Sequence, residues 1–203
     1  MKVNNIGQCN MNFGAIPLYE ATLGVKKAFS RKITPMKAIV SIMEKTDLDR
    51  PGMDYLKWDK TSYGGAIIDE FASKMPHKLR RFLLVDMPDA APKEQVKALA
   101  LYTVGFENIN LQLLQSENQL KWFKKTKGAG SLIIYALTKI AEILGKEAVC
   151  VDADRAAFKF YKKIGMKKSI DSNFREEGEF FILTKNMFKA FQQKMEEKFN
   201  ITA

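Results

Sequence analysis

The sequence predicts a mixed α/β fold of the α+β kind, in which helices flank one central sheet, and three patterns support this prediction. A basic, glycine-bearing segment at 124–131 runs into an apolar segment with helical spacing, which stops at Gly145. An apolar strand follows at 148–151. Earlier in the chain, apolar segments at 80–87 and 96–106 flank a proline-bearing loop and are expected to pair as a hairpin.

The length of 203 residues and the apolar content of 46% suit one domain with a single core. We divide this domain into a mostly helical part at 1–77, a central part at 78–185 and a C-terminal helix at 186–203. Lys139 and Glu142 interrupt the longest apolar stretches, and the N-terminal segment lacks the apolar centre of a signal peptide. A cytoplasmic protein without a membrane partner is therefore expected.

The chain is basic, with a formal charge of +10 and an isoelectric point near 9.5. Only six of its 33 basic residues are arginine, the residue preferred for bidentate contacts to phosphates and bases. A lysine-rich composition explains the charge at least as well as nucleic-acid binding does, and no zinc-finger, RNA-recognition or zipper signature accompanies it. We therefore do not expect nucleic acid as a partner.

The cysteines and the single histidine do not form a metal-binding pattern. Cys150 lies within an apolar run and is far from Cys9 in sequence, so a buried thiol is expected rather than a disulfide or a metal ligand. His77 has no cysteine, histidine or paired acid at ligand spacing and is expected to be a surface residue. We expect no metal cofactor.

The spacing of apolar residues predicts that the N-terminal third is mostly helical. A first helix begins at Leu18 and continues to Phe29, and a second begins at Thr34-Pro35, where threonine would cap the helix and proline would occupy its first position. Three further elements complete this region: a turn at 47–52, a third helix after Gly64-Gly65 that is marked by Ile67, Phe71 and Met75, and a first strand at either 2–6 or 13–18.

The segment 124–131 combines lysines and glycines at the start of a helix, a pattern typical of phosphate binding. The first turn of a helix carries N–H groups without intrahelical acceptors and the positive end of the helix dipole. Gly128 and Gly130 would let a bulky anion approach the backbone, and three lysines add charge at 124, 125 and 127. A P-loop and a dinucleotide fingerprint both fail, because Gly-Lys-Ser/Thr is missing and Ile133 stands where a third small residue is needed.

A third phosphate-binding pattern does fit this segment. Lys125-x-x-Gly128-x-Gly130 resembles the Arg/Gln-x-x-Gly-x-Gly/Ala signature of the GNAT superfamily of acetyltransferases. A second motif is similar to the family's Asn-x-x-Ala-x-x-Phe-Tyr-x-x-x-Gly-Phe stretch, and here it reads Asp154-x-x-Ala157-x-x-Phe160-Tyr161-x-x-Ile164-Gly165-Met166. With the strands that precede these motifs, the resemblance covers residues 78–185.

This resemblance implies a GNAT-like, mostly antiparallel sheet and a site for acetyl-CoA as cosubstrate. In that fold the strand that begins near Ile109 splays from the strand at 148–151, and the pantetheine arm of the coenzyme lies in the opening. The apolar alternation slips at Leu114, which indicates a bulge or irregularity in this strand. The residues implied in coenzyme binding are Leu120, Lys125, Lys127, Gly128, Ala129, Gly130, Ser131, Asp154 and Ala157.

The resemblance also places Tyr161 near the coenzyme sulfur. A tyrosine hydroxyl, with an ordinary pKa near 10, is protonated at neutral pH, so Tyr161 is expected to protonate the departing thiolate as general acid. Two residues depart from the family pattern, since Lys125 lacks the planar fork of arginine and Asp154 replaces asparagine. The general base is left open, with four candidates: Glu117, Glu107, Asp152 and water.

These expectations describe an acetyltransferase that moves an acetyl group from acetyl-CoA directly to an amine of an unidentified small molecule or protein. The N-terminal part, including Tyr55, Trp58 and Tyr63, would shape the acceptor groove. Two alternatives stay open, a non-catalytic acyl-CoA sensor and a basic nucleic-acid or ribosome-associated binding module. The C-terminal helix carries an apolar stripe that packs on the protein's own sheet or forms a homodimer contact: Phe188, Phe191, Met195 and Phe199.

Overall fold

The computed structural model describes residues 16–27, 32–49, 53, 63–73, 80–116, 124–169 and 179–202. Their strands form one nine-stranded sheet in the order β6-β1-β2-β3-β4-β5-β7-β9-β8. Within these residues, β5 and β7 are the one parallel pair, and the other neighbours are antiparallel. The strands are β1 (Ile16–Lys27), β2 (Ile33–Ile42), β3 (Arg80–Asp86), β4 (Val96–Val104), β5 (Asn108–Ser116), β6 (Lys124–Lys127), β7 (Ala148–Ala153), β8 (Lys167–Lys168) and β9 (Glu179–Thr184).

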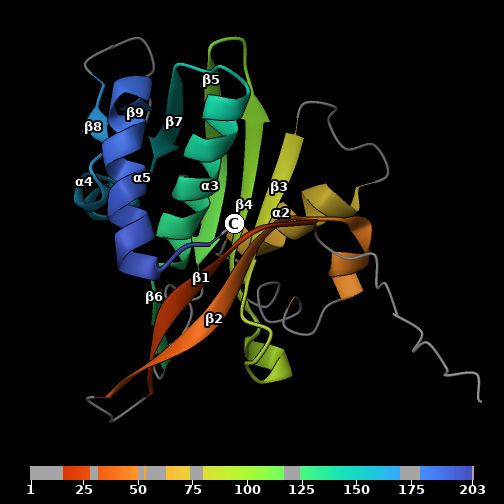
Figure 1. Cartoon of the computed structure of the whole chain (residues 1–203). Helices are drawn as coiled ribbons and strands as arrows, with labels where there is room; N and C mark the ends of the chain where they lie inside the picture. Colours follow the sequence, from red (N-terminus) through yellow and green to blue (C-terminus); the bar gives the residue numbers. More distant parts are fainter. Residues whose placement is uncertain are drawn as a thin grey trace, which may run out of the picture.

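Helices cover both faces of this sheet. They are α2 (Tyr63–Ala72), α3 (Ala129–Ile143), α4 (Phe158–Ile164) and α5 (Lys185–Phe199), with short 3₁₀ turns η1 (Lys45–Asp49), η2 (Pro92–Glu94) and η4 (Arg155–Ala157). Figure 1 shows α3 and α5 side by side in front of the sheet and α2 behind it. Alternating strand residues build the two cores: Leu83 and Val85 belong to the α3 side, and Phe82 and Leu84 pack with Ile67 of α2. Among the described helices, none has both the length and the apolar character that crossing a bilayer requires.

The two helices predicted at 18–29 and from Thr34-Pro35 are wrong, because β1 and β2 occupy these positions. Tyr19, Ala21 and Leu23 lie at alternate positions of β1 and are buried, so the period is that of a strand. Pro35 faces Gly24 of β1 and precedes Ile39, where the pairing of β2 with β3 begins. Proline is tolerated there because that part of β2 has no partner in the described ladder with β3.

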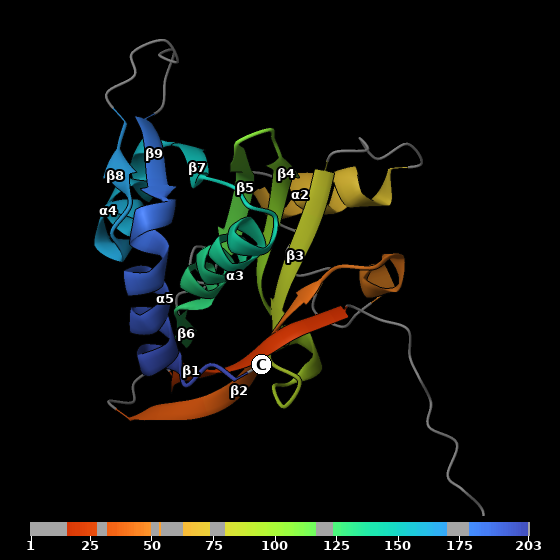
Figure 2. The same cartoon turned by 45° about the horizontal axis from the view of Figure 1, so that its top comes forward.

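Several other predicted elements are confirmed. β3 and β4 form the expected hairpin, and α2 covers most of the predicted third helix. α3 is buried along most of its length, and Gly145 follows its end with a φ of 64°. Figure 2 shows β1 and β2 crossing below the ends of α3 and α5, at a steep angle to the strands that follow.

The apolar stripe of the C-terminal helix is covered within the chain. Phe188, Phe191, Met195 and Phe199 are buried in the core that contains α3. Polar residues of α3 form the seam with α5: Gln192 Nε2 donates to Glu142 Oε2 at 2.9 Å and to Thr138 Oγ1 at 3.2 Å. The stripe therefore packs on the protein's own structure, and a homodimer, if one forms, uses another surface.

Candidate active site

The parallel strands β5 and β7 separate at one end of the sheet. Their pairing runs from Asn108 with Ala148 to Leu111 with Val151. Beyond that point the ladder between β5 and β7 ends, although residues 113–116 still pair with β4 and residues 152–153 still pair with β9, so the two strands separate there. A bulge at Gln112 coincides with the separation, because Leu101 faces Leu113 and Tyr102 faces Leu111. The predicted irregularity is thus present, two residues before Leu114.

Helix α3 begins at this open end. The N–H of Leu132 donates to the carbonyl of Gly128 at 3.0 Å, so the N–H groups of Ala129, Gly130 and Ser131 precede the first intrahelical donor and have no acceptor within the helix. Lys127, one residue before the cap, is exposed. Backbone donors, the positive end of the helix dipole and a lysine are therefore gathered where the sequence predicts an anion site.

Protein side chains occupy the space beside the two glycines of this turn. Gly128 has a φ of 111°, and a Cβ there would collide with the ring of Phe199 from α5. A Cβ on Gly130 would lie 3.3 Å from Phe160 of α4 and 3.6 Å from Leu114 of β5. On this side of the turn the glycines serve backbone conformation and close packing.

The lysines before α3 belong to a strand and not to a loop. β6 pairs with β1, and the register sets Lys125 opposite Lys26 and Lys124 opposite Lys27. Like charges directly opposite each other destabilise a sheet, so a bound anion would relieve the repulsion in this ladder. Sequence reasoning missed Lys26 and Lys27, because they stand about a hundred positions from the motif and lay in a predicted helix. The side chains of Lys27, Lys124 and Lys125 are outside the described part of the structure.

Tyr161 lies on α4 and is 4% exposed. Its ring stacks on Phe181 of β9 with a centroid distance of 5.7 Å and meets Phe160 edge-on at 5.0 Å. Burial raises the pKa of the Tyr161 hydroxyl, and the negative charge of Asp154 and the neighbouring Tyr63 raise it further. The hydroxyl is therefore held in its protonated form, which is the form that donates a proton.

Asp154 has the capping role that the sequence predicts, and it has a second partner. Its Oδ1 accepts the N–H of Ala157 at 3.1 Å, and η4 and α4 follow. Its Oδ2 accepts the hydroxyl of Tyr63 at 2.8 Å, and this hydrogen bond raises the pKa of Tyr63. The backbone N–H of Tyr63 donates to Oε1 of Gln115 on β5 at 3.1 Å. The sequence did not reveal this hydrogen bond of Gln115, because its donor, Tyr63, lies 52 residues away in the chain.

The two described candidates for the general base, Asp152 and Glu107, lie at opposite ends of the paired part of β5 and β7. Asp152 is exposed and follows Val151, the last residue of β7 that pairs with β5, so it lies where the opening begins. Glu107 precedes Leu111 by four residues, about 13 Å along a strand, and lies at the closed end of the pair. The structure therefore does not bring Glu107 to the site. Other predicted residues lie outside the described part of the chain: Glu117, Leu120, Tyr55, Trp58, His77 and Cys9.

The described side chains that could bind a metal ion are the thiol of Cys150 and the carboxylates of Asp and Glu. Cys150 is buried as predicted, and burial raises the pKa of its thiol to about 11. Throughout the described ranges, no three His, Cys, Asp or Glu side chains are grouped so that they could hold a metal ion.

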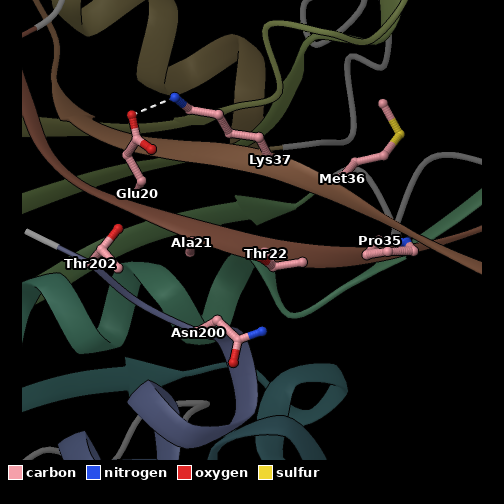
Figure 3. A pocket seen from close by; sticks show the side chains of 8 residues that line it. All are labelled: Glu20, Ala21, Thr22, Pro35, Met36, Lys37, Asn200 and Thr202. Carbon is pink, nitrogen blue, oxygen red and sulfur yellow. Dashed lines mark ion pairs between the residues drawn. The ribbon is translucent and has the colours of Figure 1, made fainter.

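Two hollows lie outside the opening. Figure 3 shows one of about 350 Å³ over β1 and β2, where Lys37 pairs with Glu20 at 2.5 Å and the C-terminal Thr202 completes the wall. It contains none of the predicted site residues. A second cavity of about 320 Å³ lies between β1, β2 and the segment after β3, and Thr126 of β6 lines it together with Lys97.

Comparisons with known proteins agree with this architecture. No protein-family model matches the sequence, and no curated protein matches it. Solved structures do match. AtaTR bound with AcCoA has a TM-score of 0.52 and 17% identity, covering 75% of this chain and 96% of the other. A protein from Desulfovibrio desulfuricans assigned to the GNAT family of acetyltransferases has a TM-score of 0.51 and 11% identity, covering 72% and 98%.

A third structure is the ribosomal-protein-S18-alanine N-acetyltransferase from Escherichia coli, with a TM-score of 0.50 and 14% identity, covering 72% of this chain and 93% of the other. These similarities and the strand order show that the chain has the GNAT fold, as its two motifs predicted.

Proposed function

We propose that the protein is an N-acetyltransferase that moves an acetyl group from acetyl-CoA directly to an amine. The observation that carries this proposal is the opening between β5 and β7, where the first turn of α3 lies beside Leu114 of β5 and the charge of Asp154, which follows β7, acts on the buried hydroxyl of Tyr161. AtaTR was solved with AcCoA, and the enzyme from Escherichia coli is an N-acetyltransferase, which favours this cosubstrate and an amine acceptor.

The first turn of α3 and the lysines of β6 and β1 are the groups proposed to hold the phosphates of the coenzyme. The N–H groups of Ala129, Gly130 and Ser131 point out of a helix N-terminus, and the ladder of β6 with β1 gathers positive charge beside it. Because phosphate carries the greater part of the charge of acetyl-CoA, this end of the opening suits its pyrophosphate. The neutral pantetheine arm would then lie between the separated strands.

Acetyl-CoA supplies the acetyl group as a thioester. When the neutral amine attacks, the C–N bond forms and the C–S bond breaks. In our proposal Tyr161 gives the proton that the sulfur takes up, and positioning of the two reactants contributes most of the remaining acceleration. The amine nitrogen loses a proton to water or to a carboxylate, for which Asp152 is the described candidate at the opening.

Thermal unfolding with acetyl-CoA tests the binding step. A ligand at 100 times its Kd stabilises the folded state by about 2.7 kcal/mol, so the melting temperature should rise with acetyl-CoA concentration. Lys26→Glu and Lys127→Glu should reduce this rise, because both exposed lysines lie on the same face of the ladder of β6 with β1 and the changes place negative charge beside the proposed phosphate site. Lys189→Glu makes the same charge change on an exposed position of α5 and should leave the rise unchanged. Equal losses in all three variants would refute the proposed phosphate site.

Release of free thiol from acetyl-CoA tests the transfer step. Small primary amines and peptides with free N-termini or lysines should be screened as acceptors, with thiol release measured against a no-acceptor blank. Amine-dependent release supports the transferase. Saturable binding of acetyl-CoA without release for any acceptor class would instead favour the non-catalytic sensor.

A further inference from the structure

Tyr63 joins three elements that border the opening. It is the first residue of α2; its N–H donates to Gln115 of β5, and its hydroxyl donates to Asp154, which follows β7. One residue therefore links the two strands at the end where they separate, through its backbone N–H on the β5 side and its side chain on the β7 side. These contacts link residues 52 and 91 positions apart, so they are formed only in the folded protein.

The hydroxyl of Tyr63 and the N–H of Ala157 together fix the Asp154 carboxylate. Each donor takes one oxygen, Oδ2 for Tyr63 and Oδ1 for Ala157, so the rotation of the carboxylate about its side-chain bonds is restrained from both sides. Each oxygen keeps a further lone pair that can accept a hydrogen bond. A carboxylate oriented in advance binds an N–H donor more tightly than a freely rotating one, because less side-chain entropy is lost.

We propose that Tyr63 is a positioning residue, which holds the Asp154 carboxylate in the orientation that accepts an amide N–H of the pantetheine arm. This inference rests on the proposed function, since it assigns acetyl-CoA to the opening. It also explains how Asp154 can act at a position where the family pattern has asparagine. An ionised aspartate cannot donate a hydrogen bond, but the hydroxyl of Tyr63 fixes the orientation of its accepting oxygens. Helix α2 would thereby be coupled to the coenzyme site.

Double-mutant cycles with acetyl-CoA binding as the readout test the proposal. Tyr63→Phe removes the hydroxyl and keeps the ring, and it should raise the Kd of acetyl-CoA by about 3- to 10-fold, the range of one hydrogen bond. Asp154→Ser keeps an N-cap for η4 but is too short to reach Tyr63. In the Asp154→Ser background, Tyr63→Phe should change the Kd by less than about twofold.

Kinetics separate positioning from proton transfer. Tyr63→Phe should raise the KM for acetyl-CoA and leave kcat nearly unchanged, whereas loss of a general acid lowers kcat. Tyr102→Phe is the matched control, because Tyr102 is a buried tyrosine of β4 that pairs with Leu111, before the strands separate. It should leave both KM and kcat near their original values.

The wild-type protein distinguishes failure of this inference from failure of the proposed function. If the wild type binds acetyl-CoA and the effects of Tyr63→Phe and Asp154→Ser on the Kd are additive, Tyr63 does not act through Asp154 and the inference is wrong, while the proposed function stands. If the wild type shows no binding of acetyl-CoA, both are overturned. Whether or not acetyl-CoA binds, a double-mutant cycle on the melting temperature of the free protein should show non-additive effects of Tyr63→Phe and Asp154→Ser, because their hydrogen bond is present without ligand.

Discussion

At the scale of single residues, Tyr161 carries the catalytic prediction. Tyr161→Phe should lower kcat by at least about tenfold and leave the Kd of acetyl-CoA nearly intact, because the hydroxyl matters when negative charge develops on sulfur. The phenyl ring preserves the contacts with Phe160 and Phe181, so stability should change little. A stable variant with unchanged kcat at saturating substrates would show that another group or water protonates the thiolate.

The raised pKa of Tyr161 also makes a prediction about pH. An acid works below its pKa, and burial moves the pKa of Tyr161 above its ordinary value near 10. The titratable groups that act on it are Asp154 and Tyr63, and the rings of Phe160 and Phe181 complete its surroundings. The ratio of wild-type kcat to that of Tyr161→Phe should therefore stay constant from pH 7 to about 10. A ratio that falls towards one above pH 8 would contradict the assignment.

Gly128 is a poor position for testing coenzyme binding, because its substitution should damage the fold. Gly128→Ala combines the strain of a positive φ with a collision against Phe199, and we expect it to cost more than the roughly 1–2 kcal/mol of strain alone. Gly165→Ala is the matched control, since its φ is 100° and nothing lies within 4 Å of a Cβ there. Chemical denaturation of both variants measures the difference.

Phe199→Leu gives the decisive comparison for this contact. A smaller side chain makes room for the new methyl group, so Gly128→Ala should cost less in the Phe199→Leu background. If the cost of Gly128→Ala equals that of Gly165→Ala in the wild-type background, the ring of Phe199 does not constrain this turn.

At the scale of elements, the seam between α3 and α5 depends on Gln192. This side chain is 4% exposed and donates to Thr138 and Glu142, so Gln192→Ala should destabilise the protein by about 1–3 kcal/mol. Gln193→Ala is the control on the next residue of the same helix, where the side chain is exposed and donates to Glu197. Its effect should stay within about 0.5 kcal/mol in the same denaturation experiment.

Helices and strands were predicted correctly where the apolar residues fitted only one periodicity. They were predicted wrongly where the apolar residues fitted both the helical and the strand periodicity. Residues 129–143 are apolar on a helical period, and Asp154 and Gly165 mark the two ends of the next helical segment, so these were found correctly. In 16–42, Leu18, Ala21 and Val25 satisfy helical spacing, while alternation from Tyr19 onwards satisfies a strand. Pairing of β1 with β2 and with β6 decides between the two, and pairing with β6, about a hundred residues along the chain, leaves no local signal.

At the scale of the whole molecule, the same limit applies to the site. Local motifs predicted the start of α3, the cap at Asp154 and the position of Tyr161, because each is contiguous in sequence. The sequence did not reveal the Tyr63 hydrogen bonds or the opposition of Lys26 and Lys125, because the topology brings these residues together. The residues assigned to the coenzyme therefore stay predictions that lie on correctly assigned elements, while those assigned to the acceptor side lie in a region where two of the predicted helices are strands.

The net charge of +10 leads to a prediction that separates the proposed enzyme from a nucleic-acid-binding protein. The coenzyme presents only a few phosphate charges to the ladder of β6 with β1, so its affinity should fall by less than about tenfold between 50 and 200 mM salt. A protein that neutralises 6–10 phosphates loses about 10³- to 10⁵-fold over the same range. Titrations of acetyl-CoA and of a mixed-sequence RNA at both salt concentrations measure the two slopes. Tight, strongly salt-dependent RNA binding together with no saturable binding of acetyl-CoA would identify the lysine ladder as a nucleic-acid contact and contradict the proposed enzyme.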